Sequence, residues 1–155
     1  MKVKIIFFIS LLFLSCAETQ DKIIYTQHTY NFNQQELEVM QITNDYRASI
    51  GLNTLTSIQQ IGYLCEEHNQ YMITKHIISH DYFYYRSQNL ESTTHATHVG
   101  EVIAYNYNTS NSTLSAWLNS PGHKRIIEGN FTNFGVSVSV DSNNRKYYTF
   151  IFVKI

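Results

Sequence analysis

The strongest constraint on the fold is the alternating pattern near the C-terminal end of the chain. Apolar residues alternate with glycine or serine from Phe134 to Val140, and a second aromatic and β-branched segment runs from Tyr147 to Val153. A period of two residues is typical of a strand. The polar residues 141–144 between the two segments predict a turn. Together they predict an antiparallel hairpin.

Helical patterns precede this hairpin. Asn33, followed three residues later by Glu36, predicts the capping box of a first helix, and Gly51 suits its end. Ser57 is the predicted N-cap of a second helix. The inner face of this second helix is defined by residues at helical spacing: Ile61, Cys65, His68 and Met72. Helices first and a hairpin last predict an α+β domain built from packed layers.

Shorter elements are expected between these two parts. Residues 79–90 predict a loop that leads into a short helix, and residues 99–107, which are apolar and partly β-branched, predict a strand. The only tryptophan lies in a short predicted helix, 114–118, as a core anchor. Ser120, with Pro121 at the first helical position, predicts the start of a further helix. No internal repeat and no second domain are apparent.

The N-terminus has the features of an export signal. Two lysines precede an apolar run, Ile5–Leu14, which is shorter than the roughly 20 residues that span a bilayer. Ser15 directly before Cys16 resembles a bacterial lipoprotein signal, in which Cys16 becomes the lipidated N-terminus. The alternative is an ordinary signal peptide cleaved nearby. Either way we expect the mature protein outside the cytoplasm, as a membrane-anchored lipoprotein of a bacterial envelope or as a secreted protein.

We therefore divide the chain into a signal peptide (1–16), a polar tether (17–32) and one domain (33–155). The formal net charge of -1 provides no basic field for nucleic acid, so no nucleic-acid partner is predicted. Once Cys16 is used for lipidation, Cys65 stands alone and no disulfide within the chain is expected. Its helical position predicts a small buried side chain, with a reactive thiol as the alternative.

Three separated segments each present one titratable side chain that could contribute to a site: His80, Glu101 and His123. They form a site only if the fold brings them together. His68 lies on an apolar helix face, which favours a core histidine bonded to backbone. His95 and His98 lie in a polar segment, 92–98, which we expect to be an exposed loop.

A series of short motifs occurs in a fixed order along the chain. The motifs are Thr43–Arg47, Gly51–Leu55, His68–Met72, Ser79-His80, Gly100–Ala104, Trp117–His123 and Asn130–Val136. Each is weak alone, but the ordered series resembles the CAP superfamily, which comprises cysteine-rich secretory proteins, antigen 5 and plant pathogenesis-related class 1 proteins. The closer likeness is to its bacterial secreted branch, SCP-like and free of disulfides. It covers about residues 37–153.

This resemblance implies an α-β-α sandwich, with helices on both faces of a small antiparallel sheet. It also implies a cleft whose residues correspond to His80, Glu101 and His123. The second glutamate of many eukaryotic members has no counterpart in this chain. Three further polar positions of the family are changed: Val102 replaces an asparagine, Lys124 an arginine and Ile126 an asparagine. These changes thin the polar surroundings of the cleft and count against catalysis.

The chemistry of the trio suits a divalent metal such as zinc, with His80 and His123 as ligands. Glu101 could orient a ring or act as a base toward bound water. The sequence has no His-Glu-x-x-His helix, no Gly-x-Ser-x-Gly elbow and no glycine-rich phosphate loop. The trio could also be a buried polar cluster that only ties elements together.

These observations leave three hypotheses for the function. We favour a non-enzymatic binding module whose cleft holds a metal or a small ligand of the cell envelope. The alternatives are a metal-dependent hydrolase acting on an envelope polymer or peptide, and a structural or interaction protein that works through the tyrosine-rich segment 82–85. The predicted partners are an envelope ligand, a lipid or a protein, and the membrane through the lipid anchor.

Overall fold

The computed structural model describes residues 28–155, so the signal segment, Cys16 and most of the expected tether lie outside the described residues. The elements follow in the order α1 (Gln34–Ser49), β1 (Thr56–Ser57), α2 (Gln59–Lys75), α3 (Phe83–Thr94), β2 (His98–Tyr105), α4 (Ser110–Asn119), α5 (Pro121–Ile127), β3 (Asn133–Val140) and β4 (Lys146–Lys154). In the part of the chain that is described, no helix has the length and apolar character needed to cross a membrane.

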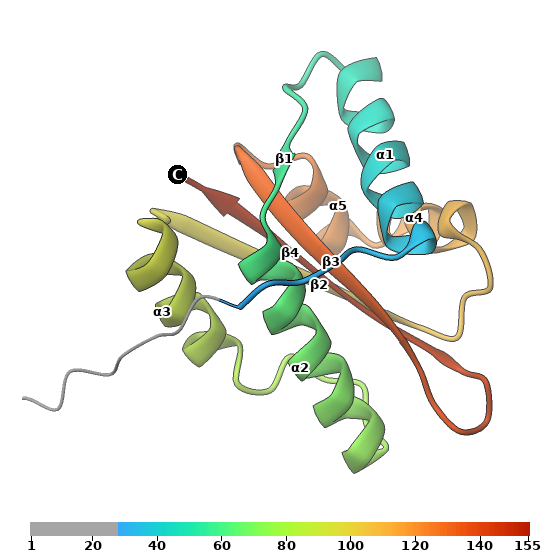
Figure 1. Ribbon diagram of the computed structural model, residues 1–155. Coiled ribbons are helices and arrows are strands. Elements are labelled where there is room, and N and C mark those ends of the chain that lie inside the picture. Colours follow the sequence, from blue (N-terminus) through green and yellow to red (C-terminus); the bar gives the residue numbers. More distant parts are fainter. Residues whose placement is uncertain (1–27) are drawn as a thin grey trace, which may run out of the picture.

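The strands form one sheet in the order β1-β3-β4-β2 (Figure 1). The predicted hairpin is confirmed: β3 and β4 pair antiparallel, with Val136 opposite Phe150. β2 joins the outer side of β4, also antiparallel, with Glu101 opposite Ile151. β1 adds a short parallel pairing at the other edge, which a two-residue strand is too short to reveal by periodicity.

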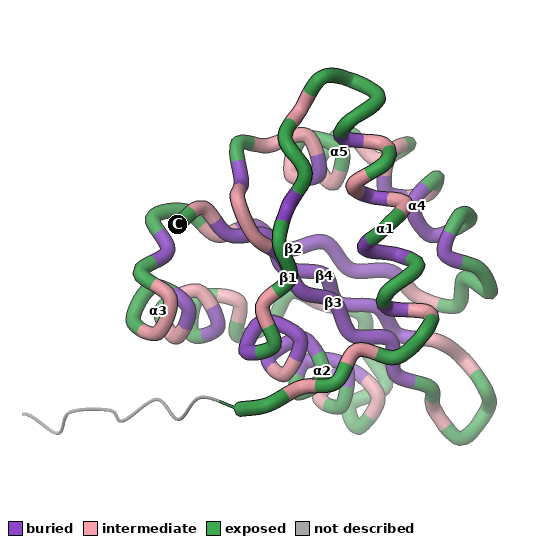
Figure 2. The backbone as a smooth tube through the Cα atoms, turned by 45° about the horizontal axis from the view of Figure 1, so that its top comes forward, coloured by how far each residue is buried: buried purple, intermediate pink, exposed green. Residues whose placement is uncertain are grey.

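Helices cover both faces of the sheet, as the α+β expectation requires (Figure 1). One face packs with α1, α4 and α5 around Trp117, Val136 and Phe150. The other packs with α2 and α3 around Cys65, Leu90 and Ile151. The central strands are therefore buried along most of their length (Figure 2). The serines of β3 are also buried, because α2 packs on the sheet face to which they point. In a hairpin with that face open, the same serines would meet water.

The predicted helix starts were right for α1 and wrong for α2. Asn33 and Glu36 form the expected capping box. Ser57 does not cap α2: Ile58 holds the N-cap position without a side-chain bond, and Ser57 is held extended by pairing with Phe134. Pairing with β3 thus displaces a local capping preference. α4 starts at Ser110, four residues before the predicted helix, because Thr109 and Ser112 form a second capping box.

The described end of the expected tether, residues 28–32, runs along the domain. The Tyr30 hydroxyl donates to Glu36 Oε1 at 2.6 Å. The rings of Tyr30 and Phe32 lie so close to Gly62 that a Cβ there would meet them at 2.5 and 2.7 Å. Position 62 of α2 therefore needs glycine, because a larger residue would clash with the segment that packs against it.

Buried Arg47 connects α1 to the segment that follows α5. Its Nη1 donates to the carbonyl oxygens of Ile127 and Gly129, and its Nε donates to that of Asn53. Carbonyl groups at the end of a helix lack partners within the helix, so a buried guanidinium satisfies them. These bonds fix α5, the helix that carries His123, against the rest of the domain.

Candidate functional site

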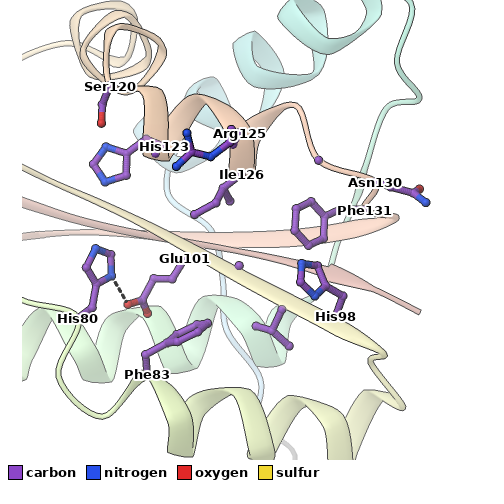
Figure 3. Close-up of a pocket in the computed structure, with 14 residues that line it drawn as sticks. His80, Phe83, His98, Glu101, Ser120, His123, Arg125, Ile126, Asn130 and Phe131 are labelled. Atoms are coloured by element: carbon purple, nitrogen blue, oxygen red, sulfur yellow. Dashed lines mark hydrogen bonds and ion pairs between the residues drawn. The ribbon is translucent and has the colours of Figure 1, made fainter.

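A pocket of about 780 Å³ lies along β2, the edge strand of the sheet, between α3 and α5 (Figure 3). The three predicted residues, His80, Glu101 and His123, all line it. His80 comes from the loop between α2 and α3, Glu101 from β2, and His123 from the first turns of α5. The fold therefore brings together side chains that lie far apart in the sequence.

Glu101 is buried and is held by Arg86 of α3. Arg86 Nε donates to Glu101 Oε2 and Arg86 Nη2 donates to Glu101 Oε1, both at 2.8 Å. Arg86 Nη1 donates to the carbonyl oxygen of Asp81, in the loop that carries His80. Charge-assisted bonds in this two-pronged geometry fix both partners strongly.

Sequence reasoning missed Arg86. A buried carboxylate needs a cationic partner, so an arginine or lysine near Glu101 could have been expected from the sequence on this ground alone. This requirement could not select among the arginines, because Arg86 meets Glu101 only through the packing of α3 against β2, and no local spacing encodes that contact.

The same carboxylate fixes the orientation of His80. His80 Nδ1 lies 2.8 Å from Glu101 Oε1. A carboxylate accepts hydrogen bonds, so Nδ1 carries the proton and Nε2 of the neutral ring keeps a free electron pair. The His80 side chain remains about half exposed, at 47%, whereas Glu101 is enclosed. This arrangement of carboxylate behind histidine is typical of imidazoles that bind metals.

His123 faces His80 across the pocket (Figure 3). The two ring centroids are 6.4 Å apart and the ring planes are tilted by 52°. Burial lowers the pKa of His123, and nearby His80 lowers it further. A neutral imidazole at neutral pH is the form that can bind a metal.

The rings of His80 and His123 are slightly too far apart to bind one metal together without a small movement. Two imidazoles on one tetrahedral zinc, with Zn–N near 2 Å, have centroids roughly 5 Å apart. The rings would have to approach by about 1 Å. Within residues 28–155, no group of three or more histidine, cysteine or acidic side chains is arranged to hold a metal. The protein would thus supply two nitrogen ligands and leave the other positions to water or a bound molecule.

Glu101 is poorly placed to act as a base. Its two carboxylate oxygens accept three hydrogen bonds, two from Arg86 and one from His80. A general base needs an oxygen within reach of the proton that it removes. The geometry therefore favours Glu101 as the group that orients His80.

The other histidines have different surroundings. His68 is buried, and its Nε2 lies 2.7 Å from the carbonyl oxygen of Ser79, which confirms a core histidine bonded to backbone. This bond anchors the loop next to His80. His95 and His98 are exposed as expected. The predicted loop 92–98 is wrong at both ends, because α3 extends to Thr94 and His98 is the first residue of β2. His98 also stacks on Phe131 and lines the pocket.

Cys65 is a buried, free thiol, as its helical position predicted. Its Sγ donates to the carbonyl oxygen of Gly135 at 3.3 Å. Burial raises the pKa of this thiol well above its usual value. An enclosed thiol with a raised pKa is a poor nucleophile, so the structure favours a buried packing role for Cys65 over a reactive one.

A second pocket, of about 490 Å³, continues along β2 beyond the histidine pair. Tyr105, Tyr107 and Trp117 contribute to its walls. It shares His80, Ser120 and His123 with the larger pocket. The two pockets are therefore compartments of one groove, with the histidine pair between them.

Tyrosines gather on the surface near the site. Tyr82, Tyr84 and Tyr85 are 60%, 64% and 65% exposed. Their rings contact one another, and Tyr71 packs edge-on against Tyr82. Exposed aromatic side chains in contact with each other are a common component of interaction surfaces.

Comparisons with known proteins give consistent results. The family model CAP, described as the cysteine-rich secretory protein family, matches residues 40–153. The uncharacterized membrane protein YlbC of Bacillus subtilis is 33% identical over 125 residues, which is 77% of this chain. The chain spans only about a third, 34%, of that relative.

Solved structures share the fold. An outer surface protein of Borrelia burgdorferi superposes with a TM-score of 0.72 at 19% identity, over 83% of this chain and 98% of that one. An extracellular protein of Bacillus anthracis with an SCP domain gives a TM-score of 0.66 at 27% identity, over 78% of this chain and 40% of that one. A cysteine-rich secretory protein of Staphylococcus aureus gives 0.63 at 21% identity, over 78% and 38%.

Proposed function

The chain belongs to the cysteine-rich secretory protein (CAP) family, and from this premise we propose that it is an extracytoplasmic binding module. Its His80–His123 pair holds a divalent metal such as zinc, or a small envelope ligand that takes the same place. The observation that carries this proposal is the hydrogen bond from His80 Nδ1 to Glu101, which leaves Nε2 available opposite His123. With two protein ligands, the metal keeps positions open for a bound molecule.

Support for a location outside the cytoplasm comes from the sequence of the N-terminal segment. We propose that Cys16 is lipidated and that the domain is anchored to a bacterial membrane on the side away from the cytoplasm. The support is the short apolar run that ends at Ser15-Cys16, together with an extracellular protein among the structural neighbours. Replacing Cys16 with alanine should release the protein from membrane fractions, whereas an unchanged distribution would favour the ordinary signal peptide.

The test of the metal site is a zinc titration of the chain from residue 17 onward, followed by calorimetry. A metal that binds only the folded state also raises the melting temperature. The double variant His80→Ala/His123→Ala should lose both effects. His95→Ala serves as the matched control, because His95 is exposed and lies outside the pocket. Equal zinc binding by the double variant would show that the pair is not the site.

Hydrolysis is the weaker alternative, because Glu101 is already engaged by Arg86 and His80. Zinc-loaded protein should therefore leave peptide, ester and glycan substrates uncleaved. Turnover that disappears in the variant Glu101→Gln would instead support the metal-dependent hydrolase.

The exposed tyrosines support a second function, in which the protein binds a partner through Tyr82, Tyr84 and Tyr85. Replacing Tyr84 and Tyr85 with serine should then abolish binding of the partner. The double histidine variant should keep that binding, since the two side chains that it alters do not belong to this surface. The reverse result would assign the partner to the groove.

A further inference from the structure

The free edge of β2 forms the floor of the groove. Asn106, directly after β2, donates its main-chain N–H to the carbonyl oxygen of Lys146, the first residue of β4, whereas the carbonyl oxygen of Ile103 accepts from Trp117 Nε1 on the opposite side. Main-chain groups of successive residues in an antiparallel strand point in alternate directions. Ile103 and the other odd-numbered residues of β2, namely Val99, Glu101 and Tyr105, therefore direct their main-chain groups away from β4.

These outward groups are largely without partners. Trp117 Nε1 already occupies the carbonyl oxygen of Ile103. Within residues 28–155, no hydrogen bond outside the pairing of β2 with β4 involves the main-chain groups of Val99, Glu101 or Tyr105. Glu101 is only 4% exposed. Val99 and Tyr105 are half-buried. Free main-chain groups at alternate residues of an edge strand are the pattern to which another strand can pair.

The groove has the length for such a strand. Val99 and Glu101 line the larger pocket, and Ile103 and Tyr105 line the smaller one. A strand rises about 3.3 Å per residue, so the edge from Val99 to Tyr105 is about 20 Å long. An added segment of about seven residues would match this length and reach both compartments.

The charges of the larger pocket favour an anionic end. Arg125 lines it and has no ion pair within the described part of the chain. The acidic residue of the lining, Glu101, is already paired with Arg86. A free carboxylate near Arg125 lies on the Val99 side of the histidines, which sets the chain direction of the ligand antiparallel to β2.

We propose that the groove binds an extended peptide, which adds to the free edge of β2 as an antiparallel strand with its acidic C-terminal end at Arg125. The proposal deepens the proposed function, because it names the class of ligand for the same groove, but it does not require a metal on the histidine pair. Main-chain hydrogen bonds supply the affinity, and the apolar walls select side chains.

The test starts from a solution pool of acetylated heptapeptides with free carboxyl ends, captured on the full-length protein and identified by mass spectrometry. The best-captured peptide is then made with N-methyl groups at odd or at even positions. One of these registers removes the donors that face β2. That register should weaken binding at least about tenfold, while the other changes it less than about threefold. Conversion of the end to a carboxamide should also weaken binding.

A protein variant provides the complementary test. Val99→Pro removes one outward N–H at a position where an edge strand tolerates proline. It should weaken binding of the peptide about tenfold, whereas the matched control Val99→Ala keeps the N–H and should change binding little. Backbone resonances of Glu101 and Tyr105 should shift when the peptide is added.

Three outcomes would overturn the proposal. The protein could capture no peptide, or the two N-methyl registers could weaken binding equally. In the third outcome, an acyl chain or a glycan fragment displaces the captured peptide completely and N-methylation of the peptide has no effect on its binding. Zinc titration of the same samples separates the two proposals. Normal zinc binding with a failed peptide test would remove the strand and leave the metal site. A positive peptide test without zinc binding would remove the metal site and leave peptide binding as the function of the groove.

Discussion

Two buried glutamates show how the same side chain serves two purposes in one domain. Glu36 accepts from the main-chain N–H of Asn33, the hydroxyl of Tyr30 and the main-chain N–H of Val138. Glu101 accepts from Arg86 and His80. The donors around Glu36 contact only other parts of the domain, so that cluster joins α1 and the segment with Tyr30 to the sheet. His80, in contrast, keeps a second nitrogen that faces the groove.

Burial and satisfied hydrogen bonds therefore do not by themselves distinguish a structural carboxylate from a functional one. The two kinds of carboxylate differ in whether a side chain that donates to the carboxylate has a second polar atom that faces an open pocket. Glu36 should therefore matter for stability alone, and Glu101 for stability and for ligand binding.

The largest effect is expected for Glu36→Ala. The change leaves the N–H of Val138 and two further donors without their partner, so the free energy of unfolding should fall by about 4 kcal/mol. Urea denaturation would measure it. The affinity for zinc, measured under conditions where the protein is folded, should match that of the unaltered protein. A loss of zinc binding in the folded variant would contradict the division between the two clusters.

A smaller loss of stability is expected for Arg86→Ala, about 3 kcal/mol, because it leaves Glu101 buried without its main cationic partner. Here the affinity for zinc should fall as well, since His80 loses the fixed carboxylate that orients it. The double variant Arg86→Met/Glu101→Leu should recover much of the stability without recovering zinc binding. Recovery of both would show that the orientation of His80 is irrelevant.

Glu101→Gln should lower the affinity for zinc as well as the stability, because the neutral amide leaves buried Arg86 without its anionic partner. The amide keeps the shape of the side chain but weakens the orientation of His80, and loss of such a partner typically lowers metal affinity about 10- to 100-fold. Calorimetry against zinc would measure the change, with Glu36→Gln as the matched control. Similar affinities in both variants would show that Glu101 is as structural as Glu36.

The smallest effect concerns pH. Burial lowers the pKa of His68, with a further contribution from Arg86, and burial likewise lowers that of His123. In the unfolded chain both titrate near 6.5, so as pH falls the unfolded state takes up these protons first. The stability associated with the neutral rings is therefore present above a pH of about 6.5 and declines below it.

His68→Gln should reduce this decline, measured by urea denaturation between pH 8 and pH 5. The exposed His95 provides the control, since His95→Gln should leave the pH profile unchanged. A profile that is unchanged in both variants would remove His68 as a source of acid sensitivity.

Much of the fold was predictable because local patterns and the final packing agree. The alternation in β3, the Asn33–Glu36 box and the apolar face of α2 all express preferences that the tertiary structure keeps. The exceptions arise where pairing between distant segments determines the local conformation. Ser57 becomes part of β1 because it meets Phe134, and a window of a few residues contains no sign of that contact.

The site divides in the same way. His80, Glu101 and His123 could be selected because each stands in a motif, and the family likeness indicated that these motifs share a cleft. Arg86 could not be selected, because its role arises from the packing of α3 against β2. The unpaired main-chain groups of β2 were also beyond reach, since they depend on the strand order in the sheet.

The position of Glu101 bears on the solubility of the protein. An edge strand with unpaired main-chain groups is a template on which a second copy could add, and such addition leads to aggregation. A charged side chain directed inward on an edge strand is one feature by which proteins limit such addition, and Glu101 is such a residue. Helices α3 and α5 also pack against β2, so the edge is protected from a second sheet by both the helices and the buried charge.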